Sequence, residues 1–501
     1  MTQAERVSAT ALRRPSLALI ALGVNLAMTL PLALVLNLWQ DEAYTLHTTS
    51  AGVAYAFTHA ISFEQSAPLY FVLLTLWRHF GDSLFFLRLF SVLCIAGSVA
   101  LVPSLARRYV PKANPVLVTA VVVCNPVVVW AAVEMRPYAL IVFLSALLLL
   151  TYHQAFAGQR PRAGSTVAYA ACVILALYTQ YYMAFLIAGQ AVTTLFFYRR
   201  SLLRFVLAGA AGLVAFAPLI AIVPGQVQNF KDGFAPPSLA HSFVSVSGVL
   251  LRYVLPLPFP HAKLIYAVLF FLIAIAIVIL RPRFTSSVNG SILVTTACAF
   301  ILFAVGTYVV GVHVLNRHVA SLFLPATLSV FAALSFLRSP SRERAAAVWS
   351  GVAIVLSLTV LVQAYGALAK AGDWVRVTAY VRAHETPGEP IAIFEAENAL
   401  PFEYYYDGPN RVVAVPRAVD FRRYQVAQFV IRSQAQLQTV IPPAPRLWLI
   451  TAGECTSSNV QFGCATLERF VSQRYAVKSD ATFYGSRVRL LERRNSSSAG
   501  H

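Results

Sequence analysis

The chain has 501 residues, of which 58% are hydrophobic and only 12% are charged, and its mean hydropathy is +0.67. Soluble domains carry about 25% charged residues, so this composition excludes an ordinary soluble protein and indicates a membrane protein. The formal net charge of +19 would suit a nucleic-acid-binding protein, but the cations cluster between apolar segments, on every second loop. This distribution follows the positive-inside rule, so we expect contact with anionic membrane lipids and no nucleic acid partner.

The first apolar segment, Leu17–Leu38, is longer than the apolar core of a cleaved signal peptide and is predicted to remain as the first membrane-spanning helix. With the basic clusters in the cytoplasm, the sequence predicts about eleven spans, each near the length that crosses about 30 Å of hydrocarbon. The N-terminus is then cytoplasmic and the C-terminal region extracytoplasmic, in a multi-pass protein of the plasma (inner) membrane. The predicted spans are 16–38, 83–106, 114–133, 137–156, 164–181, 183–198, 202–223, 261–280, 290–311, 316–337 and 345–368.

Two further apolar segments are not counted as spans. Pro68–Phe80 is short, and counting it would place the cations that follow the next span on the outer side. It is therefore predicted to form a helix that lies along the outer surface or enters the membrane only partway. His241–Leu255 is predicted to be a second element of this kind.

The composition changes after Lys370. Residues 371–501 contain 12 of the 20 acidic residues, and their apolar runs shorten to strand length. The predicted fold is therefore an all-α polytopic membrane domain over residues 1–370, followed by a small α/β domain over 371–501 on the outer face. Strands are expected at Ile391–Phe394, Arg411–Val415, Leu447–Thr451 and Arg487–Leu491, and helices near Trp374–His384 and Tyr424–Val440.

The cysteines agree with this division. Cys455 and Cys464 are the only pair in the second domain, and a short loop there, in a compartment that permits disulfides, predicts a bond between them. The other four fall inside predicted spans, where they are expected to pack as small apolar residues. They are Cys94, Cys124, Cys172 and Cys298.

The predicted outer loops contain few carboxylates, so those present are candidates for function. Asp41 and Glu42 follow the first span, and acids at the membrane edge are costly and usually functional, although solvated residues at a helix end would look the same. Arg317 runs against the positive-inside rule and calls for a partner such as a phosphate. The other polar residues on this side also have purely structural explanations. Glu64 could belong to a polar lead-in to a helix, and Glu134, Arg136 and Tyr138 could close a tight hairpin between two spans. Tyr181 and Tyr182 could belong to an aromatic girdle at the membrane interface, and His318 directly follows Arg317.

Taken together, these residues match the needs of one reaction. Transfer from a lipid phosphate to a hydroxyl requires a carboxylate that accepts the hydroxyl proton. It also requires fixed cations that stabilise the departing phosphate. Aromatic side chains would provide a face for a sugar ring, and grooves between helices would hold an isoprenoid tail.

The motifs also resemble a known family. In order and spacing they are similar to the start of the GT-C membrane glycosyltransferases, most of all to the bacterial branch that includes protein O-mannosyltransferase-like and aminoarabinose-transferase-like members. The resemblance covers most of residues 17–325. The segments that support it are Asp41-Glu42, Pro68–Tyr70 with Trp77, Arg88–Ser91, Glu134–Tyr138 and Arg317.

This resemblance implies an inverting glycosyltransferase that uses a polyprenyl-phosphate sugar donor and an acceptor hydroxyl on a glycan, lipid or protein at the outer face. Asp41 would be the general base, and Glu42 and Glu134 further catalytic carboxylates that shape the site. No cofactor is established, since a divalent metal would need converging carboxylates and oxygen ligands alone do not prove one. The implied substrate-binding residues are Glu64, Arg136, Tyr138, Tyr181, Tyr182, Arg317 and His318, with Lys231 and Arg252 as further phosphate candidates.

Two other functions are compatible with the composition. A transporter or flippase of lipid-linked intermediates would more often show broken helices, charges near the middle of the membrane and internal repeats. A non-catalytic scaffold would use the outer domain as its working part. Because the charges of this sequence lie at the outer edges of the spans, a reaction at the membrane surface is favoured over transport.

The alternation of basic loops makes a prediction about topology. A reporter fused after Arg200 is expected to lie in the cytoplasm, and one fused after Gly372 on the opposite side, because the cation clusters alternate between them. Paired phosphatase and fluorescent-protein fusions measure both positions. A cytoplasmic signal from the Gly372 fusion would mean that the span count is wrong by one.

Overall fold

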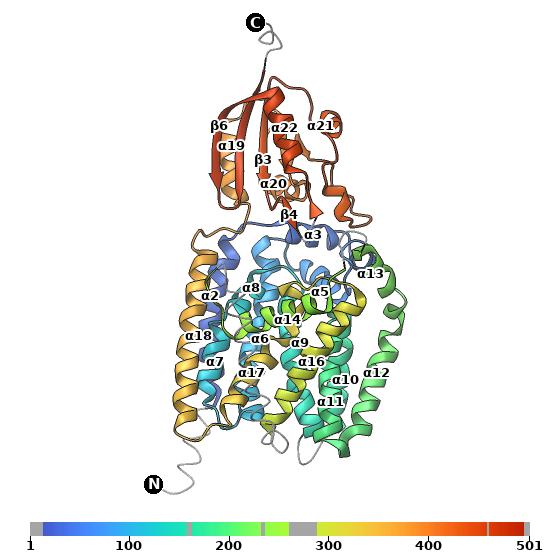
Figure 1. Cartoon of the computed structure of the whole chain (residues 1–501), viewed down its shortest axis with the longest axis vertical. Coiled ribbons are helices and arrows are strands. Elements are labelled where there is room, and N and C mark those ends of the chain that lie inside the picture. The colour runs from blue at the N-terminus through green and yellow to red at the C-terminus, as the bar shows by residue number, and fades with distance from the viewer. Residues whose placement is uncertain (1–13, 158–162, 232–235, 260–287, 458–459, 495–501) are drawn as a thin grey trace.

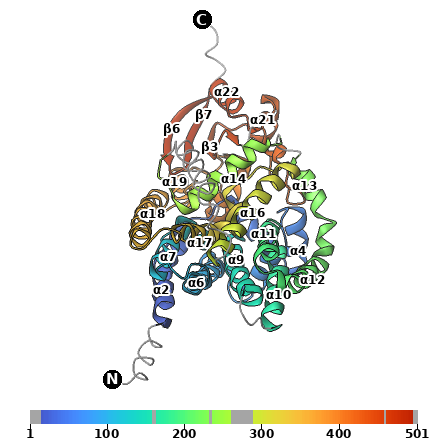
Figure 2. The ribbon, with the colours of Figure 1, turned by 60° about the horizontal axis from the view of Figure 1, so that its bottom comes forward.

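The computed structural model describes residues 14–157, 163–231, 236–259, 288–457 and 460–494. A long bundle of helices, blue to yellow in Figure 1, carries at one end a smaller domain with a β-sheet, drawn in orange and red. Figure 2 shows α9 near the middle of the bundle, and α6, α10 and α17 pack against it. The body of the bundle is formed by α2(Arg14–Val35), α6(Leu84–Tyr109), α7(Pro115–Val123), α8(Pro126–Val133), α9(Tyr138–Tyr152), α10(Ala163–Thr179), α11(Met183–Phe197), α12(Leu202–Ile220), α14(Leu239–Val254), α16(Val288–Val310), α17(Phe323–Leu334) and α18(Ser341–Tyr365).

Ten of the eleven predicted spans coincide with these helices, and the remaining one, 261–280, lies outside the described residues. Within the described residues, seven helices are long and apolar enough to cross a membrane by length and composition, or eight if α7 and α8 count as one bent span. Exposed apolar side chains cover the perimeter of the bundle, for example Leu203, Val214 and Val362. A surface of this kind is stable against lipid, so the chain is a multi-pass membrane protein.

The bend between α7 and α8 has a local cause. Pro126 lacks the N–H that would continue the helix, and the side chain of Asn125 accepts a hydrogen bond from Val127 N to cap α8. The Asn125 amide also donates to the carbonyl of Tyr253 at 2.7 Å. The two helices therefore meet at 49°, and the break is tied to α14.

Four short helices complete the bundle near its junction with the sheet domain: α3(Gln40–Thr48), α4(Val53–Ser62), α5(Leu69–Arg78) and α13(Val223–Lys231). The prediction of a short helix at 68–80 is confirmed by α5, but its apolar side chains Tyr70, Phe71 and Leu74 are buried among neighbouring helices. The element therefore packs inside the bundle. The helix predicted at 241–255 is present as α14, and its position relative to the membrane surface stays a prediction.

The C-terminal domain has a five-stranded sheet in the order β2-β1-β3-β7-β6. The first three strands are parallel, and β7 and β6 add an antiparallel hairpin. The strands are β1(Ile391–Phe394), β2(Val412–Ala414), β3(Arg446–Ala452), β6(Tyr475–Phe483) and β7(Ser486–Arg493), with a small separate pair β4(Thr456–Ser457) and β5(Val460–Gln461).

Helices cover both faces of this sheet. Trp374 of α19(Trp374–His384) and Phe402 of α20(Ala399–Tyr405) pack against one face. Leu437 of α21(Gln434–Val440) and Phe470 of α22(Cys464–Arg474) pack against the other. Because helices cover both faces, every residue of β1 is buried, and all four are apolar. The predicted α/β fold of this region is confirmed.

The domain also differs from prediction in detail. The prediction of one helix near Tyr424–Val440 is wrong, because the segment forms the 3₁₀ turn η6(Val426–Phe429) and then the separate helix α21. Between them, Ile431 N donates to the carbonyl of Phe462, and Ser433 caps the new helix. The strand β6 and the helices α20 and α22 were not predicted. The boundary proposed after Lys370 lies in the connection between α18 and α19.

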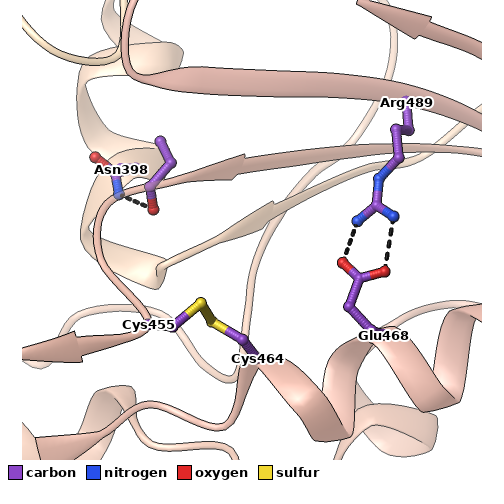
Figure 3. The surroundings of a disulfide bond; sticks show 6 residues. Asn398, Cys455, Cys464, Glu468 and Arg489 are labelled. Carbon is purple, nitrogen blue, oxygen red and sulfur yellow. Dashed lines mark hydrogen bonds and ion pairs between the residues drawn. A yellow bond between two sulfur atoms is a disulfide. The ribbon is translucent and has the colours of Figure 1, made fainter. Parts of the chain in front are cut away.

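The predicted disulfide joins Cys455, just after β3, to Cys464 at the start of α22 (Figure 3). Nearby, Arg489 of β7 donates two hydrogen bonds to Glu468 of α22, at 2.8 and 2.6 Å. The helix is thus held to the sheet by one covalent and one ionic link. The remaining cysteines that were assigned to the spans are free.

Removing the disulfide should destabilise this domain. The bond closes a loop of 9 residue steps, so its loss in Cys455→Ser is expected to cost about 2–3 kcal/mol through the added freedom of the unfolded chain. Thermal unfolding of the purified protein, with and without reductant, measures the effect. The variant should lose the sensitivity to reductant that the wild type shows; equal sensitivity in both would contradict the bond.

Candidate active site

A cavity of about 720 Å³ lies at the junction of the bundle and the sheet domain. The sheet domain is docked over it by aromatic contacts: Tyr44 and Phe63 of the bundle pack against Phe421 and Tyr424. Gln65 also donates to the carbonyl of Tyr424 at 3.0 Å. Both parts of the chain therefore contribute to its walls. Of the predicted site residues, the cavity is lined by Asp41, Glu64, Arg136, Tyr138, Tyr181, Tyr182, Arg317 and His318.

Asp41 occupies the first turn of α3, where a carboxylate interacts favourably with the helix dipole. Its side chain is 15% exposed and forms an ion pair with Arg317, at 2.8 Å from Oδ2 to Nη1. Arg136 approaches the same oxygen at 4.0 Å. Asp41 thus faces the cavity between two arginines that come from distant segments of the chain.

Arg136 is held by a second carboxylate. Its Nη1 lies 2.8 Å from Glu64 Oε2, and it also donates to Thr45 Oγ1 at 2.9 Å and to the carbonyl of Asp41 at 3.1 Å. Burial raises the pKa of Glu64, while Arg136 acts in the opposite direction. These contacts fix the guanidinium beside Asp41.

Arg317 belongs to the 3₁₀ turn η4(Asn316–Leu322), which precedes α17. Tyr253 donates to the carbonyl of Asn316, and Ser145 donates to the carbonyl of Ser321 at 2.7 Å. The turn is therefore anchored at both ends, and the side chain of Arg317, 36% exposed, extends into the cavity.

Aromatic rings line the wall next to Arg317. Tyr182 stacks on His318, with ring centroids 4.9 Å apart, and Tyr138 stacks on Trp130 at 4.4 Å. Flat apolar faces beside charged groups suit a sugar ring or an isoprenoid unit. Of the other two phosphate candidates, Arg252 is exposed on α14 and does not line the cavity, and the side chain of Lys231 lies outside the described residues.

Glu42 and Glu134 are not among the residues that line the cavity. Glu42 is fully buried, and Arg88 donates to both of its oxygens at 2.9 and 2.6 Å. Lys370 links the two carboxylates, at 2.9 Å from Glu42 and 3.2 Å from Glu134. Burial alone would raise the pKa of Glu42, but Arg88 and Lys370 outweigh it and hold this pKa at about 2. The pair belongs to a buried ionic network behind the cavity wall.

This network connects to the cavity through Trp39, whose indole N–H donates to Glu134 and whose ring lines the cavity. Arg88 also donates to three carbonyls at the end of α2, those of Ala33, Leu36 and Asn37. Lys370 belongs to the connection that leads into the sheet domain. One cluster of charges therefore joins the end of α2, the start of α3 and the base of the sheet domain.

The sheet domain adds lining residues that were not predicted, above all Glu395, Glu397 and Tyr424. Burial raises the pKa of Glu397 to about 7, and its carboxylate accepts a hydrogen bond from Tyr44. A signal was present in the sequence: both acids directly follow the all-apolar strand β1, and ligands commonly bind at the carboxyl ends of parallel strands. Among the described residues, no group of three or more His, Cys, Asp and Glu side chains is placed to hold a metal ion.

The buried pair makes a prediction about stability. Arg88→Met leaves the buried Glu42 with Lys370 as a cationic partner and the backbone N–H of Met135 as a hydrogen-bond donor. Loss of the Arg88 charge is expected to cost about 3–5 kcal/mol. Asp82→Ala is the control, because it removes the exposed pair with Arg78 and should cost less than about 1 kcal/mol. Thermal unfolding in detergent compares the two. Equal effects would mean that the buried pair does not hold this junction together.

No model of a known protein family matches the sequence, and no curated protein is similar to it. Solved structures are similar in fold. The chain superposes on ArnT from Cupriavidus metallidurans in the apo state with a TM-score of 0.56 and 13% identity, covering 97% of this chain and 98% of ArnT. ArnT bound to undecaprenyl phosphate gives a TM-score of 0.55 and 13% identity over 98% of each chain. The archaeal oligosaccharyltransferase AglB from Archaeoglobus fulgidus gives a lower TM-score of 0.46 at 10% identity, covering 95% of this chain and 74% of that one.

The similarity to ArnT extends over both the bundle and the sheet domain, since almost the whole of each chain is covered. At 13% identity it concerns the fold and not the individual side chains. The predicted fold is confirmed: this chain has the fold of ArnT, a helical bundle with a C-terminal sheet domain.

Proposed function

We propose that this protein is an inverting glycosyltransferase that moves a sugar from a polyprenyl-phosphate donor to an acceptor hydroxyl at the outer face of the plasma (inner) membrane. The observation that supports this most directly is Asp41, a carboxylate in a large cavity between Arg136 and Arg317. A proton acceptor next to two fixed cations is what transfer from a phosphate leaving group requires. The acceptor is a glycan, a lipid or a protein.

Asp41 is the general base in this proposal. As the acceptor oxygen bonds to the anomeric carbon, its proton passes to Asp41. The bond between that carbon and the phosphate oxygen breaks on the opposite side, and its electron pair remains on the phosphate. Arg317 and Arg136 stabilise this charge. Attack opposite to the leaving group inverts the anomeric configuration.

Arg317 has two roles in this scheme. In the described structure it pairs with Oδ2 of Asp41, so this oxygen is occupied by the guanidinium. A phosphate that binds Arg317 competes for the same guanidinium and leaves Asp41 more available to the acceptor hydroxyl. Binding of the donor thus prepares the base.

Support for a polyprenyl phosphate comes from the walls of the cavity and from the fold. Apolar residues of α11, α13 and α16, namely Phe185, Val227 and Val310, line it beside the charged groups. ArnT, which shares the fold, was solved with undecaprenyl phosphate bound. The same kind of lipid would place its phosphate at Arg136 and Arg317 and its isoprenoid chain along the apolar residues.

Glu42 and Glu134 act as positioning residues in this proposal, because the cavity is not lined by them. Glu64 positions Arg136, and Tyr138, Tyr181, Tyr182 and His318 provide the surface for sugar or lipid. The cavity faces the cell exterior if the basic loops are cytoplasmic, which places the sheet domain outside and the N-terminus inside.

The decisive experiment follows release of the free carrier phosphate by purified protein given a panel of polyprenyl-phosphate sugars and cell-envelope acceptors. A glycosyltransferase releases one carrier phosphate for each sugar transferred. A transporter or flippase, the competing function, moves the lipid across proteoliposomes without releasing it. Transport without release would overturn the proposal.

Asp41→Asn should slow transfer strongly without affecting folding. The amide keeps the shape of the side chain but cannot accept the proton, so the rate should fall by about 10²–10⁴. Asp420→Asn is a matched control, because Asp420 pairs with Arg422 on the surface of the sheet domain, and its activity should be normal. Transfer by Asp41→Asn at close to the wild-type rate would show that Asp41 is not the base.

Arg317→Ala should behave differently from Asp41→Asn. It removes a partner of the phosphate, so binding of undecaprenyl phosphate should weaken along with the rate. Binding to protein in nanodiscs measures this directly. Unchanged carrier affinity in Arg317→Ala would place the phosphate elsewhere in the cavity.

A further inference from the structure

The sheet domain presents carboxylates to the cavity from two neighbouring strands. Glu395 and Glu397 follow β1, and Glu454 follows β3, its parallel neighbour. All three line the cavity. The carboxyl ends of these strands thus meet the wall opposite the bundle, in the place where parallel sheets usually bind ligands.

These acids differ from the carboxylates on the bundle side. Asp41 and Glu64 each pair with an arginine. In the part of the chain that the structure describes, no lysine or arginine forms an ion pair with Glu395, Glu397 or Glu454. The cavity is therefore polarised, with its cations on the bundle side.

Glu395 is the most unusual of the three. Its side chain is only 6% exposed, yet its Oε1 has no hydrogen-bond partner among the described residues. Burial, with Glu397 and Glu454 nearby, raises the pKa of Glu395 to about 8. A buried polar group without a partner destabilises the fold, so its presence calls for a ligand.

The backbone leaves room for this side chain. Gly453 has a φ of +92°, in the left-handed region that favours glycine, and a Cβ atom there would lie 2.9 Å from Glu395 Oε2. On the bundle side, Gln180 also lines the cavity with an unpartnered buried oxygen, Oε1. The buried polar atoms of the cavity that lack a hydrogen-bond partner among the described residues thus include Glu395 Oε1 and Gln180 Oε1, together with the hydroxyls of Tyr138 and Tyr181, Gln226 Oε1 and Arg136 Nε.

We propose that Glu395 and Glu397 form a sugar subsite in the sheet domain, which binds the hydroxyl groups of a neutral sugar ring opposite the arginines. A hydroxyl donates to a carboxylate and accepts from a carboxylic acid, so it satisfies Glu395 in either state. The ring belongs to the donor or to a glycan acceptor. The role of this subsite in a reaction rests on the proposed function. Its test measures the binding of sugars and does not require transfer.

The test separates binding from folding. Glu395→Leu removes an unpartnered buried carboxyl group, so thermal stability should be unchanged or higher. Affinity for neutral sugars should fall about tenfold or more, the loss expected when a hydrogen bond to a charged or strongly polar group is removed. Glu468→Ala is the matched control in the same domain: it breaks the pair with Arg489 shown in Figure 3, and should lower stability while leaving sugar affinity unchanged.

The probes are the methyl glycosides of glucose, galactose and mannose, added to the full chain in nanodiscs, because maltoside detergents would compete. Saturation-transfer NMR measures binding. Undecaprenyl phosphate, which has no sugar, should bind wild type and Glu395→Leu equally. Weaker binding of a polyprenyl-phosphate sugar to the variant would assign the subsite to the donor, and weaker transfer with normal donor affinity would assign it to the acceptor.

Three results would overturn the subsite: no binding of any methyl glycoside to the wild type, equal binding to wild type and Glu395→Leu, or a loss of stability in Glu395→Leu as large as that in Glu468→Ala. None of them concerns turnover. A protein that binds glycosides through Glu395 but transfers no sugar would keep the subsite and refute the glycosyltransferase proposal. A protein that transfers sugar equally well with and without Glu395→Leu would keep the glycosyltransferase proposal and refute the subsite.

Discussion

The ion pair between Arg88 and Glu42 is the constraint on which the rest of the site depends. Both side chains are fully buried, and a buried charge is tolerated only when it is paired and hydrogen-bonded. Arg88 meets this condition with Glu42 and with the carbonyls at the end of α2, and Lys370 extends the cluster to the base of the sheet domain. Because Glu42 must face inward, the rotation of α3 is set, and the preceding residue, Asp41, must face the cavity.

The two halves of the cavity then follow from two kinds of secondary structure. The bundle contributes arginines at helix ends and turns, each anchored by further hydrogen bonds, and the parallel strands contribute acids at their carboxyl ends. An anionic leaving group and a hydroxyl-bearing ring place opposite demands on their surroundings. Building the walls from separate domains allows both demands to be met within about 720 Å³.

The sequence predicted the layers of the fold better than the details of the site. Ten spans and the strand β1 follow from long apolar runs, which are local signals. The local pattern of residues does not distinguish Asp41 from Glu42, and only the family resemblance assigned the base to Asp41. The rotation of α3, a helix that was not predicted, turns Asp41 toward the cavity and Glu42 inward. Lys370 had no local signal, since its partners lie hundreds of residues earlier in the chain. Glu395 and Glu397 had a local signal, their place after the apolar strand β1. That signal indicates a site only if β1 is parallel to its neighbours, and the parallel arrangement is set by pairing with strands far away in the sequence.

The placement of Glu395, Glu397 and Glu454 on loops that follow β1 and β3 has a consequence for how such a protein can diversify. Loops at strand ends accept substitutions and insertions without disturbing the sheet beneath them. They are also separate from the helices that must insert into lipid and from the arginines that would meet the phosphate. If the proposed subsite binds sugar, exchange of a few of these loop residues would change the preference for one sugar over another and leave the arginines of the bundle untouched.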